Sequence, residues 1–137
     1  MAREVFWDTS GLFALFNQDD SAHRQTVELA RVQRLSKRMG LTTDAVIGEC
    51  CTLLTARQKS HLIPRLLDFS EKSPLLKVLH LDEQLVAATK RFLRAHLDHT
   101  YSFVDCSSFV VMSLRHLREA ATTDGHFVEA GFQALLR

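Results

Sequence analysis

The stretch from Val5 to Gly11 constrains the fold more than any other part of the sequence. Three apolar residues, from Val5 to Trp7, predict a short buried strand, and Asp8 follows them directly. Two hydroxyl residues and a glycine then lead into a predicted helix that ends near Phe16. A strand that ends in a carboxylate and turns at once into a helix places that carboxylate at the carboxyl edge of a sheet, where α/β proteins bind their ligands.

The composition is that of one ordinary globular domain. With 137 residues, 46% of them hydrophobic, the chain can build its own core, and we expect a single domain over residues 1–137. No apolar run approaches the ~20 residues of a membrane span, and Met1–Glu4 leads into a strand rather than a signal-peptide core. The formal net charge of +1 neither requires nor excludes a nucleic-acid partner. Three cysteines without metal-ligand spacing indicate reduced thiols, as in a cytoplasmic protein.

The rest of the chain alternates between helical and strand-like patterns. The predicted helices cover residues 21–39, 44–54, 60–69, 82–93 and 105–117, with a short helical piece at 127–131. The predicted strands after the first cover residues 41–43, 75–79, 119–123 and 132–135, the last of them at an edge. This alternation predicts an α/β fold of three layers, α/β/α, in which helices cover both faces of a parallel sheet.

Capping residues predict several of the helix boundaries. We expect Asp20 or Ser21 to cap the helix that follows them, and Gly40 to end that helix. We expect Asp44 and Asp82 to cap the helices after the second and third strands.

Four acidic residues fall at predicted junctions between elements: Asp8, Glu49, Asp105 and Asp124. They lie at the end of the first strand, one turn into the helix after the second, at the start of the most apolar helix, and after the 120–123 run. In a parallel sheet all four can reach one edge. Each also has a simpler interpretation: Asp8 and Asp105 as helix caps, Glu49 as a solvated residue, and Asp124 as part of a turn.

A cluster of carboxylates indicates a bound divalent cation, because the acids would otherwise repel one another and raise each other's pKa. Oxygen ligands without a Cys or His partner favour Mg²⁺ or Mn²⁺. Such ions polarise a phosphate, lower the pKa of a water and stabilise a leaving oxygen. Hydrolysis of phosphodiesters is the chemistry that this arrangement serves best.

Four segments resemble, in order, the motifs of the PIN-domain family, and in particular its VapC-type toxin nucleases. They are residues 5–10, 42–49, 103–108 and 121–127, and the resemblance extends over nearly the whole chain. It implies a PIN-like fold with a central, mostly parallel sheet. It also implies a Mg²⁺- or Mn²⁺-dependent ribonuclease in which a water, rather than a side chain, attacks the RNA.

The resemblance also implies roles for individual residues and for partners. Asp8 and Asp105 would be the principal metal ligands, Glu49 would complete the site, and Asp124 would hold a second ion or its waters. Ser10 and Thr123 would be hydroxyls that orient a ligand carboxylate or a water. The family often pairs with a cognate antitoxin, a segment of which fills a groove near the active site, and it commonly forms homodimers.

Some features keep more than one interpretation. Leu12, Leu15 and Phe16 either line an antitoxin groove or belong to the core. Basic residues at 31–38 and at 90–94 either follow an RNA backbone or lie on solvated helix faces. His126 either contacts RNA, assists proton transfer or makes a local hydrogen bond in the turn.

Three alternatives compete with the toxin hypothesis. The first is a PIN-domain nuclease that processes RNA without an antitoxin, and the second is a catalytically inactive module that binds RNA or protein. The presence of all four acids argues against the second. The third is a phosphoacceptor domain, which is disfavoured because Asp8 has no adjacent acid and no lysine follows Lys90.

Overall fold

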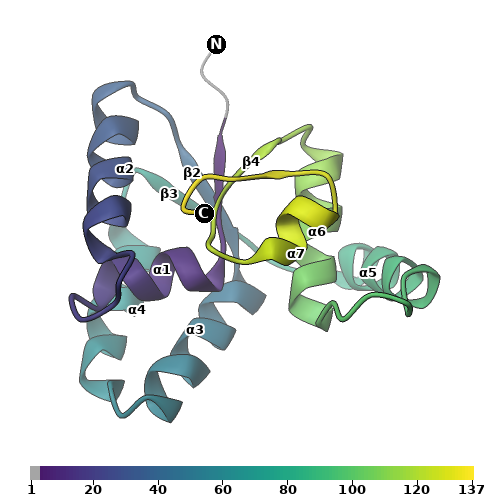
Figure 1. Cartoon of the computed structure of the whole chain (residues 1–137), viewed down its shortest axis with the longest axis horizontal. Helices are drawn as coiled ribbons and strands as arrows, with labels where there is room; N and C mark the ends of the chain where they lie inside the picture. The colour runs from purple at the N-terminus through teal and green to yellow at the C-terminus, as the bar shows by residue number, and fades with distance from the viewer. Residues whose placement is uncertain (1–3) are drawn as a thin grey trace.

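The sheet has five parallel strands in the order β3-β2-β1-β4-β5 (Figure 1). The computed structural model describes residues 4–137. Residues 1–3, which belong to the start that we expect not to be a signal peptide, lie outside this range. All four pairings between neighbouring strands are parallel, which confirms the expected sheet, and β5 lies at an edge as predicted. The strands are β1 (Val5–Trp7), β2 (Gly40–Thr43), β3 (Leu76–Leu79), β4 (Glu119–Ala121) and β5 (Gln133–Ala134).

Helices cover both sides of this sheet, which confirms the three-layer α/β/α prediction. Figure 1 shows α1 and α2 on one side and α5 and α6 on the other, while α3 lies near the carboxyl ends of the strands and contacts both α1 and α6. Across residues 4–137, no helix is long and apolar enough to span a bilayer. The helices are α1 (Thr9–Phe16), α2 (His23–Leu35), α3 (Asp44–Ala56), the 3₁₀ helix η1 (Ser60–Leu62), α4 (Ile63–Lys72), α5 (Glu83–Ala95), α6 (Phe103–Leu114) and α7 (Gly125–Glu129).

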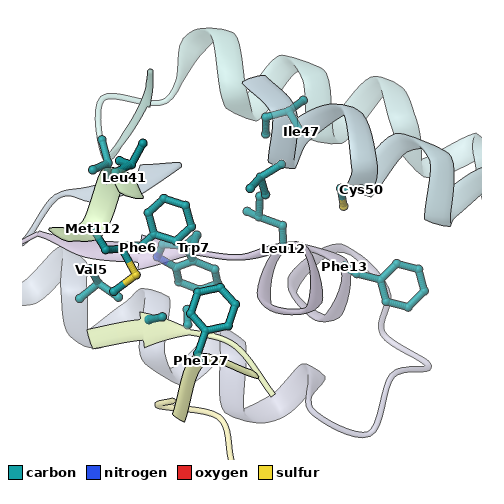
Figure 2. Packing of buried hydrophobic residues seen from close by; sticks show 14 of the residues in the cluster. Val5, Phe6, Trp7, Leu12, Phe13, Leu41, Ile47, Cys50, Met112 and Phe127 are labelled. Atoms are coloured by element: carbon teal, nitrogen blue, oxygen red, sulfur yellow. The ribbon is translucent and has the colours of Figure 1, made fainter. Parts of the chain in front are cut away.

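The core forms around β1, all of whose residues are buried. Figure 2 shows Phe6 and Trp7 of this strand and Phe127 of α7 among the residues of the buried cluster. Phe127 is fully buried, and its ring also meets the ring of Phe109 of α6 edge-on at a centroid distance of 4.9 Å. This burial anchors the short helix α7, which would be marginal alone, against the rest of the domain.

The strand order reverses at β1, because β2 and β3 extend the sheet on one side and β4 and β5 on the other. The backbone N–H of Asp8 donates to the carbonyl of Ala121 across this point, at 3.2 Å. A Cβ at Gly11 would come within 2.2 Å of the same carbonyl oxygen, so only glycine permits this approach of α1 to β4. In open α/β sheets, the carboxyl ends of the strands at such a switch point are where ligands bind.

The prediction that Gly40 ends the second helix is wrong. Helix α2 ends at Leu35, the left-handed position after it is Lys37 at φ 57°, and Gly40 begins β2. A Cβ at Gly40 would lie 3.1 Å from both Trp7 Cδ1 and Leu76 Cδ1, so the glycine makes room for packing between three neighbouring strands.

Two of the predicted helix caps are also wrong. Neither Asp20 nor Ser21 caps α2: its N-cap is Ala22, whose backbone N–H donates to the Asp20 carboxylate at 2.8 Å. Thr43, not Asp44, caps α3 and accepts from the N–H of Val46.

The carboxylate of Asp44 is used elsewhere. It accepts from the N–H of Leu81 and lies 2.6 Å from Nδ1 of His80, so it joins α3 to the chain after β3. The capping role of Asp82 on α5 is confirmed, because it accepts from the N–H of Leu85. The local sequence pattern thus predicted the cap correctly for Asp82, whereas Asp44 makes tertiary contacts with His80 and Leu81 instead of capping α3.

Candidate active site

Asp8 lies between β1 and α1, but its side chain does not cap the helix. The side chain instead turns toward β4, where the hydroxyl of Thr122 donates to Oδ2 at 2.9 Å. Asp8 is 4% exposed. The interpretation of this carboxylate as a simple helix cap is therefore wrong, and its position at the switch point needs another explanation.

Burial raises the pKa of Asp8 to about 7. Hydrogen bonds from the Thr9 backbone and from Thr122 act in the opposite direction, while the charges of Asp105 and Asp124 raise the pKa further. The three aspartates, from three distant parts of the sequence, therefore lie close enough to interact. A cation among them would stabilise the ionised form that burial and repulsion now disfavour.

Asp105 is the third residue of α6, and the cap of that helix is Ser102 rather than Asp105. The two residues form a capping box in which Asp105 Oδ2 accepts from the N–H of Ser102 at 3.1 Å. The same oxygen lies 3.0 Å from Nδ1 of His126. Within residues 4–137, the second carboxylate oxygen, Oδ1, receives no hydrogen bond, so it is the oxygen available to a ligand.

Asp124 caps α7, and its Oδ1 accepts from the N–H of His126 at 2.9 Å. The local turn hydrogen bond expected for this segment is therefore present. One potential ligand atom from each of Asp105, Asp124 and His126 falls within 4.8 Å of the others. Burial lowers the pKa of His126, but its hydrogen bond to Asp105 and the charges of Asp124, Asp105 and Glu129 raise it more, so the net shift is upward.

Glu49 reaches the site through Thr9, whose hydroxyl donates to Oε1 of Glu49 at 2.6 Å. Glu49 is partly buried in α3. Burial raises the pKa of Cys50 to about 12, and the charges of Cys51, Asp8 and Glu49 add to this. Both carboxylates therefore act on one thiol. Asp8, Asp105 and Asp124 form the centre of the site, and Glu49 is linked to it from the side of α3.

A chain of hydroxyls supports Asp8. Because the single proton of Thr122 points to Asp8, the Ser10 hydroxyl, 3.0 Å away, must donate to Thr122 Oγ1. Ser10 Oγ in turn accepts from the N–H of Thr123, and Thr122 Oγ1 accepts from the N–H of Asp124. These contacts fix the segment after β4 against the start of α1.

Thr122 is a site residue that the sequence interpretation missed, since it assigned this kind of role to Thr123. Thr123 is exposed, and its backbone N–H rather than its hydroxyl contacts Ser10. The role of the Thr123 hydroxyl stays a prediction. The sequence feature that indicates Thr122 is its spacing of two residues from Asp124, because residues i and i+2 of an extended chain point to the same side.

The donor set fits a hard divalent cation. Over residues 4–137, no Lys or Arg forms a salt bridge with any of the four acids, and the one basic partner of Asp105 and Asp124 is His126. Carboxylates without a Lys or Arg partner, one of them buried with a raised pKa, are oxygen ligands of the kind that Mg²⁺ and Mn²⁺ take.

Comparison with known proteins defines the class of this fold and site. The PIN domain family model matches residues 5–133, so the chain belongs to the PIN-domain family. This assignment excludes the phosphoacceptor alternative.

Its relatives include the 23S rRNA-specific endonuclease VapC20 of Mycobacterium tuberculosis, in strains CDC 1551 and H37Rv. Each is 32% identical to this chain over 128 residues, which cover 93% of this chain and 95% of VapC20. The crystal structure of VapC20, described as a sarcin-ricin loop cleaving toxin, superimposes with a TM-score of 0.81 at 30% identity and covers 93% of this chain and 95% of that one.

Proposed function

We propose that this protein is a VapC-type toxin, a divalent-cation-dependent endoribonuclease that cleaves ribosomal RNA in the cytoplasm. The observation that carries this proposal is the meeting of Asp8, Asp105 and Asp124 at the switch point of the sheet. Their charges interact, and none of them is neutralised by a Lys or Arg salt bridge within residues 4–137. Repulsion among these carboxylates costs stability, and a cation bound among them would offset that cost.

In this proposal Asp8 and Asp105 are the principal cation ligands, and Glu49 and Asp124 complete the site. A divalent cation held there would polarise the scissile phosphate and lower the pKa of the attacking water. Thr122 orients Asp8 and favours its ionised form by donating to Oδ2. Thr9 orients Glu49 by donating to Oε1.

The proposed substrate is the loop of 23S rRNA that VapC20 cuts. Its basis is the similarity over nearly the full length of both proteins. Cleavage of one loop in a large folded RNA requires recognition of shape and unstacked bases rather than a long base-paired sequence. This supports a surface around the acids, rather than a deep pocket, as the place where substrate choice is made.

The test is cleavage of purified ribosomes and of deproteinised 23S rRNA, with cut sites mapped by primer extension. We expect one dominant cut in Mg²⁺ or Mn²⁺ and none in EDTA. Asp8→Asn and Asp105→Asn should each abolish cleavage, because the amide keeps the shape but loses the charge. The matched control is Asp82→Asn, since Asn also caps helices well and Asp82 belongs to α5. Full activity in EDTA, or in both site variants, contradicts the proposal.

We further propose that a cognate antitoxin occupies a cavity of about 610 Å³ between α2, α4 and the start of β3. Leu15 and Phe16, two of the three residues considered for an antitoxin groove, line it. The third, Leu12, is fully buried and belongs to the core. The other lining residues include Ala30, Leu62, Phe69 and Leu75 on the walls and His23, Arg34, Lys59 and Arg65 among the basic residues.

The polar group that marks this cavity is the side-chain amide of Gln33, which is 6% exposed. Its Oε1 accepts from the indole N–H of Trp7 at 2.9 Å, but its Nε2 has no hydrogen-bond partner in the part of the chain that the structure describes. A buried donor without a partner costs about 1–3 kcal/mol, so an acceptor on the occupant would relieve it. We therefore propose an acidic, amphipathic antitoxin segment that presents an oxygen to Gln33.

Co-expression with the adjacent gene product and measurement of complex affinity test this partner. Gln33→Glu keeps an acceptor for the Trp7 indole N–H but removes the donor, so it should keep the fold, weaken the complex at least tenfold and leave RNA cleavage by the free protein unchanged. Unaltered affinity in this variant contradicts the assignment of the cavity. The homodimer implied by the family resemblance stays a prediction, which sedimentation of the free protein can check.

A further inference from the structure

His126 contacts two of the proposed cation ligands through two different groups. Its backbone N–H donates to Oδ1 of Asp124 at 2.9 Å, while its ring Nδ1 lies 3.0 Å from Oδ2 of Asp105. Asp105 lies in α6 and Asp124 caps α7, with β4 between the two helices. One residue therefore sets the relation between the two acids.

The chemistry of the contacts decides what the His126 ring does. An ionised carboxylate only accepts hydrogen bonds, so Nδ1 of His126 carries the proton and donates to Asp105. The other ring nitrogen, Nε2, lies 3.0 Å from the hydroxyl of Thr100. The ring of Tyr101 meets the imidazole edge-on at a centroid distance of 5.4 Å and restricts its rotation. Both ring nitrogens are thus engaged, and neither offers a lone pair to a cation in this arrangement.

The two carboxylate oxygens of Asp105 differ in the hydrogen bonds that they accept. Oδ2 accepts from both Ser102 and His126, whereas Oδ1 receives no hydrogen bond within residues 4–137. Two donors on one oxygen fix the rotation of the carboxylate and leave the other oxygen for the cation.

We propose that His126 is a positioning residue: it holds Asp105 by its Nδ1 proton, presents Oδ1 to the cation, and does not bind the cation itself. This inference rests on the proposed function, in which Asp105 is a ligand. Distance alone does not decide between the two roles, because one possible ligand atom each of Asp105, Asp124 and His126 lies within 4.8 Å of the others.

The experiment compares two substitutions of His126 that place a side-chain amide nitrogen at different distances from the backbone. In His126→Asn the amide nitrogen takes the place of Nδ1, three bonds from Cα, while in His126→Gln it lies one bond further out. Binding of Mn²⁺ to the whole protein is measured by calorimetry. We expect Asn to keep the affinity within about threefold and Gln to lose about tenfold or more, the range found for residues that orient metal ligands. Thermal melts confirm that each variant is folded.

A spectroscopic measurement on the unsubstituted protein separates a positioning role from direct ligation. Electron spin echo modulation of bound Mn²⁺ should show no directly coordinated histidine nitrogen. A coordinated nitrogen, or equal Mn²⁺ affinity in His126→Gln and the unsubstituted protein, overturns the inference while the proposed function stands. If the unsubstituted protein binds no Mn²⁺, both are overturned. Should His126→Gln not fold, Thr100→Val, at an exposed residue that contacts Nε2, is expected to weaken binding, and unchanged binding overturns the inference.

Discussion

The hydroxyl of Thr122 donates a 2.9 Å hydrogen bond to Oδ2 of Asp8, joining the ends of two neighbouring strands that are 114 residues apart in the chain. Both residues are buried, so water cannot replace this bond if it is lost. The contact partly offsets the cost of an ionised carboxylate at the switch point. It is therefore a sensitive place to test how the fold prepares the site.

Replacing Thr122 by Val should lower the affinity for Mn²⁺ about tenfold, because Asp8 loses a donor that favours its ionised form. Thr122→Ser keeps the hydroxyl and is the matched control. Calorimetric titration of both variants checks the prediction. Equal affinity of the Val variant and the unsubstituted protein would show that Thr122 does not support the cation site.

Without a divalent cation, the contribution of Asp8 to the free energy of unfolding should fall as the pH rises from about 4 to above 7. Burial raises the pKa of Asp8 from its ordinary value of 3.8 to about 7 in the folded protein, so over this range the folded state binds more protons than the unfolded state. The stability from the protonated form is present at low pH and lost as pH passes 7, a loss of a few kcal/mol.

Asp8→Asn removes this titration and should flatten the difference between melting temperatures at pH 5 and pH 8 in EDTA. Added Mg²⁺ should restore stability at pH 8 in the unsubstituted protein but not in the variant. Identical pH profiles of the two proteins in EDTA would be incompatible with the raised pKa of Asp8.

Gly11→Ala should destabilise the protein by about 1–3 kcal/mol, since the new Cβ would fall 2.2 Å from the carbonyl oxygen of Ala121 and push α1 away from β4. Gly48→Ala is the matched control, because a Cβ there meets nothing within 4 Å and removes a glycine from α3. The control should gain up to about 1 kcal/mol. Chemical denaturation measures both, and a neutral Gly11→Ala would mean that the α1–β4 contact is looser than described.

The basic residues of α5 are predicted to contact the RNA backbone, because this helix packs against α6, which carries Asp105. Lys90, Arg91 and Arg94 are exposed there. Arg91→Ala and Arg94→Ala should each weaken binding of a catalytically inactive variant to rRNA and reduce the salt dependence, by about 0.7 in log–log slope for each lost phosphate contact on a single strand.

The control for this series is Arg31→Ala on α2. Arg31 is exposed, forms a 2.6 Å ion pair with Glu28, and lies on α2, on the other side of the sheet from α5 (Figure 1). It should leave both the affinity and the salt slope unchanged. If the α5 variants behave like this control, the basic residues at 90–94 are a solvated helix face, the other interpretation that the sequence allowed.

Local sequence was sufficient for features that depend on neighbours in the chain. The apolar run before Asp8 and the cap at Asp82 follow from strand burial and from the orphan N–H groups of a helix start, and both are found as predicted. The parallel order of strands and helices then brings the predicted acids to the carboxyl ends of β1 and β4. The sequence pattern therefore anticipated the architecture and the three aspartates whose charges interact.

Tertiary structure alone decided which oxygen, hydroxyl or ring touches which acid. Gly40 reads as a helix end but makes room for Trp7 and Leu76, and Thr122 rather than Thr123 bonds to Asp8. The sequence allowed His126 an RNA contact, a role in proton transfer or a local hydrogen bond in the turn, but it did not predict that the two ring nitrogens contact Asp105 and Thr100. The physical reason is that hydrogen bonds and packing between distant segments depend on bond directions and on differences in distance of a few tenths of an ångström. Residue type and spacing along the chain do not specify either of these.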